Sequence, residues 1–121
     1  MRLFALRGAV SVDRNRREDI LARTEELMRQ VLERNRLEPE ALVSCVFTAT
    51  DDLDAEFPAL AARRLGLDRV PLLCAREIAV PGALERVIRV LVHYHAPEDH
   101  TPQHVYLGEA RSLRRDLDAA Q

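Results

Sequence analysis

The chain has 121 residues, of which 47% are hydrophobic and 31% charged, and its formal net charge is −2. This composition is typical of a single globular domain with a real core. The nearly balanced charge gives no reason to expect nucleic acid or an anionic membrane as a partner. All 18 basic residues are arginines. Codon or growth-temperature bias is the simpler explanation, but each of these cations is a planar fork suited to carboxylates.

Cysteine usage and hydropathy indicate a cytoplasmic protein. The two cysteines, Cys45 and Cys74, each stand in an apolar stretch, which favours reduced thiols over a disulfide framework. The N-terminal stretch has no long apolar region, and no segment approaches the length needed to span a membrane.

The first third of the chain predicts a strand and then a long helix. Residues 2–12 alternate loosely between apolar and polar types, as in a half-buried strand. Asp13 or Asn15 is placed to cap the start of the following helix. The EPE sequence at residues 38–40 is a break that ends this helix. Between residues 15 and 36, apolar pairs recur at helical spacing: Ile20/Leu21, Leu27/Met28 and Val31/Leu32.

The rest of the chain predicts four more strands and a short helix. Pro58 stands near the start of that helix, within residues 51–67, and Gly66 ends it. A turn of helix or coil follows residue 107, and the polar tail is expected to be mobile. Mixed elements along one chain predict an α+β or α/β-type sandwich with the helices on one face of a sheet. The four strands are expected over residues 41–50, 70–80, 86–95 and 104–107.

Three predicted strands each carry one charged residue among small or apolar neighbours. Arg89 lies between Val87 and Leu91 on its face of the fourth strand, and Arg7 and Glu77 have similar settings on the first and third. A charge in such a place is costly unless an opposite charge meets it. An Arg89–Glu77 ion pair that serves only the fold explains this as well as a ligand does. The excess of arginines favours a pocket for a polyanionic small molecule.

Other chemistries find little support in the sequence. No dinucleotide, phosphate-loop or CxxC motif occurs, and Cys74 has no histidine beside it in sequence, which favours a small buried hydrophobe over a nucleophile. Zinc could use a pair of histidines on one strand face, but the spacing matches no established metal motif, and a solvated strand end is the simpler account. The four histidines concerned are His93, His95, His100 and His104.

An ordered set of motifs resembles one family, the monofunctional α/β (AroH-class) chorismate mutases. The set runs from RGAVSV through TATDDL, FPALAAR, VPLLCAREI and RVIRVLV to HVYLGEARSLRRDL, and it covers nearly the whole chain. The resemblance implies the rearrangement of chorismate to prephenate, without a metal or cofactor. It also implies a homotrimer, closed as a pseudo-α/β-barrel, with active sites at the subunit interfaces.

The resemblance further implies roles for individual residues. Arg89 matches the arginine that donates to the substrate's ether oxygen, and Arg7 matches one that binds a carboxylate. Glu77 and Cys74 match the pair near the ring hydroxyl, and Tyr106 matches a tyrosine on the side-chain carboxylate. The remaining matches form a pocket wall (Phe57, Ala59, Arg63, Leu73) and a C-terminal segment that closes over the site (Leu113, Arg114).

Two positions depart from the family pattern. Leu60 stands where relatives can carry a lysine, and Leu73 where they can carry a threonine. A non-catalytic trimeric sensor with the same architecture remains the alternative. An intact set of Arg7, Glu77, Arg89 and Tyr106 favours the enzyme, because a sensor could lose the ether-oxygen donor without harm.

Overall fold

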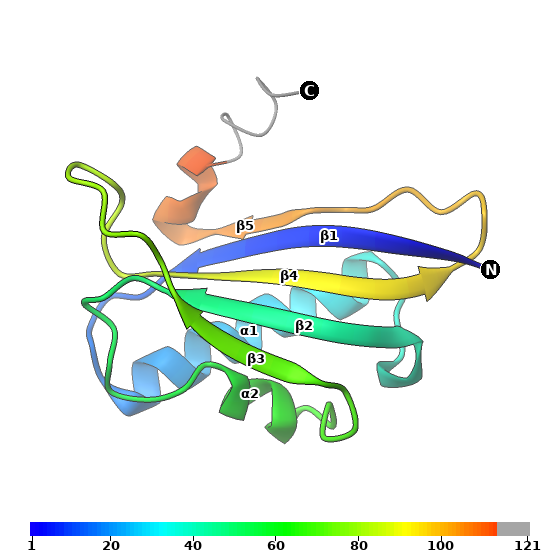
Figure 1. Ribbon diagram of the computed structural model, residues 1–121, viewed down its shortest axis with the longest axis horizontal. Coiled ribbons are helices and arrows are strands. Elements are labelled where there is room, and N and C mark those ends of the chain that lie inside the picture. The colour runs from blue at the N-terminus through cyan, green and yellow to red at the C-terminus, as the bar shows by residue number, and fades with distance from the viewer. Residues whose placement is uncertain (114–121) are drawn as a thin grey trace.

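A computed structural model describes residues 1–113 of the protein (Figure 1). Five strands and two α-helices make up most of it, together with two short 3-10 helices. In chain order the elements are β1 (Arg2–Ser11), α1 (Arg17–Arg34), η1 (Pro39–Ala41), β2 (Leu42–Ala49), α2 (Ala59–Arg64), β3 (Leu72–Arg76), β4 (Val87–Ala96), β5 (Val105–Leu107) and η2 (Gly108–Ser112).

The strands form one mixed sheet in the order β3-β2-β4-β1-β5. The central strand β4 is antiparallel to both β1 and β2, whereas β3 and β5 run parallel to their neighbours at the two edges. Four strands therefore end, and β4 begins, at the same end of the sheet, on the left in Figure 1. This end is where the charged residues singled out from the sequence gather.

Both helices lie on one face of the sheet, which confirms the predicted sandwich (Figure 1). The apolar stripe of α1 packs there because its residues recur at helical spacing; Ile20, Leu27 and Val31 are fully buried. The sheet supplies every second residue of β4, from Ile88 to Tyr94, to the same core.

Among residues 1–113, no α-helix packs against the opposite face of the sheet, which stays partly exposed. Leu3 is 51% exposed and Leu91 is 38% exposed. A smaller cluster of Ala9, Val87 and Tyr106 covers one end of this face, together with Ala110 and Leu113. The rest of this face is left uncovered by the described residues.

Two local predictions were wrong. The third strand ends at Arg76, so Glu77 follows the strand instead of lying inside it, and its amide donates to the Ala49 carbonyl oxygen. The long helix has Arg16 as its N-cap residue, with no side-chain cap, because the Asn15 side chain bonds elsewhere.

The polar tail after Leu113 lies outside the described residues. Among residues 1–113, no helix combines the length and the apolar composition needed to cross a bilayer.

Candidate active site at the end of the open sheet face

Strand register sets one row of residues across the open face at the end where β4 begins. Ala9 of β1 is paired with both Arg89 of β4 and Tyr106 of β5. Thr48 of β2 is paired with Arg89 on its other side. With strands spaced about 4.8 Å apart, the Cα atoms of Arg89 and Tyr106 lie roughly 10 Å apart. The small Ala9 separates two large polar side chains.

Residues 1–113 leave most of the hydrogen-bonding capacity of Arg89 unused. Its Nε lies 3.7 Å from Glu77 Oε2, which is an ion pair but too long for a hydrogen bond. The side chains of Arg89 and Glu77 are 35% and 24% exposed, so the predicted pair exists but is loose and partly solvated. Within the described chain, the buried Arg89 Nε and the buried Tyr106 hydroxyl have no hydrogen-bond partner.

Glu77 is oriented by a residue that the sequence analysis missed. The Thr48 hydroxyl donates a short hydrogen bond to Glu77 Oε2, the same oxygen that faces Arg89. Strand alternation alone could place Thr48 on one face of β2. Only the register could show that this face meets Arg89 and the segment after β3.

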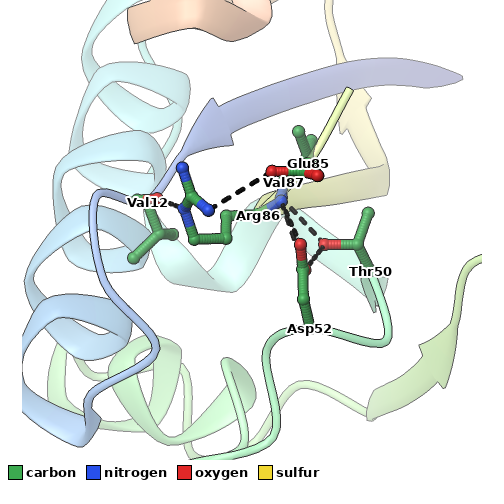
Figure 2. A network of polar contacts seen from close by, with 6 residues as sticks. All are labelled: Val12, Thr50, Asp52, Glu85, Arg86 and Val87. Atoms are coloured by element: carbon green, nitrogen blue, oxygen red, sulfur yellow. Dashed lines mark hydrogen bonds and ion pairs between the residues drawn. The ribbon is translucent and has the colours of Figure 1, made fainter. Parts of the chain in front are cut away.

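A polar network fixes the start of β4, just before Arg89 (Figure 2). Both carboxylate oxygens of Asp52 accept from the Arg86 amide, at 3.2 and 3.0 Å. The Thr50 hydroxyl donates to Asp52 over 2.5 Å and accepts from the Val87 amide over 3.0 Å. Arg86 has a φ of 49°, a left-handed conformation that is uncommon for a residue other than glycine. Asp52 therefore holds an unusual backbone geometry at the entry to β4.

Arg7 lies on the open face, and its backbone is bonded to His104, the residue before β5. Its pairing with Leu91 puts it diagonally across from Arg89 on the neighbouring strand. The Arg7 amide donates to His104 Nδ1 over 3.0 Å. Burial, and then the charge of Arg7, lower the pKa of His104 below its ordinary value of 6.5. His104 therefore stays neutral beside the cluster of arginines.

Two of the other histidines also have local partners. His100 Nε2 lies 2.7 Å from the Tyr94 hydroxyl, and His93 Nδ1 lies 3.3 Å from the Ser44 hydroxyl. In the part of the chain that the structure describes, no group of three or more histidine, cysteine or acidic side chains could hold a metal ion.

The predicted pocket wall lies elsewhere on the molecule, around α2 and β3. Phe57 and Leu73 are 70% and 63% exposed. They line a hollow of about 350 Å³, together with Ala59, Leu60, Arg63 and Cys74. Cys74 is half-buried and packs towards the helix side of the sheet, so it faces away from Glu77, as strand alternation predicts.

The structure thus divides the predicted site residues into two groups. Arg7, Glu77, Arg89, Tyr106 and Leu113 meet at one end of the open face. The second group surrounds the hollow beside α2 and consists of Phe57, Ala59, Arg63, Leu73 and Cys74. Arg114 lies outside the described residues.

Comparisons with known proteins agree on one family. The family model for chorismate mutase type I matches residues 3–117. The chain belongs to this family. It is 49% identical over 119 residues to a chorismate mutase AroH from Thermus thermophilus, covering 96% of this chain and 97% of the relative. It is 41% identical over 120 residues to a chorismate mutase AroH from Bacillus subtilis strain 168, covering 97% and 94%.

A solved structure supports the same family. The chorismate mutase from Clostridium thermocellum Cth-682 superposes with a TM-score of 0.87 at 44% sequence identity, covering 90% of this chain and 98% of that one. Family and fold agree with the resemblance inferred from the motifs. The alternative of a non-catalytic sensor finds no support among these relatives, all of which are named as chorismate mutases.

Proposed function

We propose that the protein rearranges chorismate to prephenate by holding the substrate in a compact conformer and stabilising charge on the breaking ether bond with Arg89. Chorismate mutase activity follows from membership in the type I family. The roles of individual residues, the trimeric assembly and a cytoplasmic location, which two free cysteines favour, are proposals.

Two unpartnered polar groups carry the assignment of the site. The Arg89 Nε and the Tyr106 hydroxyl are buried without hydrogen-bond partners within residues 1–113. A buried donor without an acceptor costs free energy, so such groups need an explanation such as a ligand. They belong to the same row of the sheet, on either side of Ala9. A small molecule with several acceptor oxygens would satisfy both groups at once.

The reaction needs only these kinds of groups. A pericyclic rearrangement involves no proton transfer and no covalent intermediate, so orientation and electrostatics supply the catalysis. Arg89 donates to the ether oxygen, where negative charge grows, and Arg7 and Tyr106 hold the two carboxylates. Glu77, kept in place by Thr48, faces the ring hydroxyl. The substrate is also bounded by Phe57, Ala59, Arg63, Leu73 and Cys74, and by Leu113 and Arg114 of the C-terminal segment.

We also propose a homotrimer in which each active site combines two protomers. In one protomer, the Arg89 group and the Phe57 group lie on different parts of the molecule. The open face also exposes Leu3 and Leu91, apolar surface that an interface between copies would bury. Arg63 in the second group is exposed and has no ion pair with any described residue. It is therefore available to a substrate held by the neighbour.

Subunit complementation tests the shared site. Arg89→Ala and Arg63→Ala assemblies are each purified as parents, and in a third preparation the two chains are coexpressed and purified as mixed assemblies. If the sites are shared, some interfaces combine an intact Arg89 with an intact Arg63, so the activity exceeds that of either parent. Activity equal to the average of the two parents would refute shared sites.

The direct test of the function follows the loss of chorismate by ultraviolet absorbance and identifies prephenate as the product. We expect turnover without any added metal or cofactor, in the presence of EDTA. Tight binding of chorismate without turnover would contradict the proposed mechanism and restore the sensor alternative.

A further inference from the structure

Asn15 makes contacts that its position in sequence does not explain. It directly precedes the N-cap of α1, yet the structure shows no side-chain cap on that helix. Its Oδ1 accepts from the amides of Asp54 and Ala55 over 3.0 and 3.1 Å. Its Nδ2 donates to Asp54 Oδ1 over 2.7 Å. The Asn15 side chain therefore binds a loop far away in sequence instead of capping the helix.

The same loop is held a second time at Glu56. Glu56 Oε1 accepts from Arg17 Nε over 2.9 Å, and its Oε2 accepts from the Phe57 amide over 2.9 Å. The Phe57 amide is the main cause of a lowered Glu56 pKa, and Arg17 adds to it. Asn15, just before α1, and Arg17, its first residue, thus hold residues 54–57 in place through side-chain hydrogen bonds.

The loop of residues 54–57 forms one wall of a second hollow, of about 440 Å³. Cys74 and Thr48, from β3 and β2, line the same hollow. Residues 54–57 belong to no helix or strand, so the sheet ladder does not fix their position. Phe57 is 70% exposed although its backbone is tethered. Its backbone is thus held in place, while its ring is exposed and available for a contact outside the protomer.

We propose that Asn15 is a positioning residue that fixes the 54–57 loop and thereby presents Phe57 to the substrate. The inference rests on the proposed role of Phe57 as part of the substrate pocket. Asn15 touches neither substrate nor reacting atoms; it saves the cost of ordering the loop when the substrate binds. Its loss therefore weakens binding and leaves the chemical step, which depends on Arg89, nearly unchanged.

A double-mutant cycle tests the proposal. Asn15→Ala, Phe57→Ala and the double variant are compared by KM and kcat for chorismate. We expect Asn15→Ala to raise KM roughly 3- to 10-fold, as for a few lost hydrogen bonds, with kcat within about twofold of the parent. The double variant should match Phe57→Ala alone, because residues that act through one another are not additive. Asp13→Ala is the matched control, an exposed neighbour that should change neither constant.

A conservative variant separates positioning from other effects. Asn15→Asp combined with Asp54→Asn keeps acceptor oxygens for the amides of residues 54 and 55 and exchanges the amide and the carboxylate that meet across the 2.7 Å contact. Its KM should therefore lie closer to that of the parent than the KM of Asn15→Ala does. Additive effects in the cycle, or a normal KM in Asn15→Ala when Phe57→Ala raises it, would overturn the proposal. If Phe57→Ala itself leaves KM unchanged, the role of Phe57 is wrong and the inference fails with it, while chorismate turnover still stands.

Discussion

Replacing Arg89 with lysine should separate the role of this residue in catalysis from its role in stability. The lysine keeps the positive charge but loses the planar fork that can donate to an ether oxygen and a carboxylate together. Loss of one donor aimed at charge that develops in the transition state typically lowers kcat about 10²- to 10³-fold. We expect Arg89→Lys to fall in this range.

The structure limits the accompanying change in stability. The one ion pair of Arg89 with a described residue is the 3.7 Å contact with Glu77, and both side chains are partly exposed. A solvated pair of this kind contributes about 0.2–1 kcal/mol to the free energy of unfolding. The thermal midpoint should therefore fall by no more than roughly 5 °C.

The assay combines chorismate turnover with thermal unfolding of the same preparations. Arg29→Lys is the matched control, because Arg29 pairs with Glu25 at 2.6 Å on the surface of α1, far from the site in sequence. It should leave kcat unchanged. A near-normal kcat in Arg89→Lys would remove Arg89 from the mechanism, and a large loss of stability would show that the Glu77 pair serves mainly the fold.

Three further predictions concern other parts of the molecule. Burial raises the pKa of Cys45 to about 12, so a thiol reagent at pH 8 should label only the half-buried Cys74 in the folded protein; rapid labelling of both would contradict this. The pKa of His104 is lowered from 6.5 in the folded state, so its contribution to stability is complete above about pH 6.5 and is lost as the pH falls towards the lowered value. Urea unfolding at pH 7.5 and 5.5 should therefore show a smaller pH dependence of stability in His104→Gln than in the parent. An unchanged pH dependence would refute the assignment. Gly108 has a φ of 63°, and a Cβ there would clash with the Ser11 hydroxyl oxygen. Gly108→Ala should therefore lower stability by at least about 1–2 kcal/mol in denaturant unfolding and raise KM by displacing the segment that carries Leu113. Parent-like values would show that the segment adapts.

The sequence determined the elements and the family because both are written in local patterns. Apolar pairs at helical spacing define α1, and period-two alternation assigns Arg7, Arg89 and Leu91 to the open face. Prediction from local pattern failed where a contact with residues distant in sequence determined the structure. Asn15 looks like a helix cap, but its partners are Asp54 and Ala55.

Tertiary structure decided which residues meet. Register puts Ala9 between Arg89 and Tyr106 and brings Thr48 to Glu77. A shift of one residue in any strand would send these side chains to the other face. No property of a single strand encodes that pairing, since it depends on how five strands pack together on two helices. The residue types of this site were therefore set by the sequence, and their arrangement was set by the sheet.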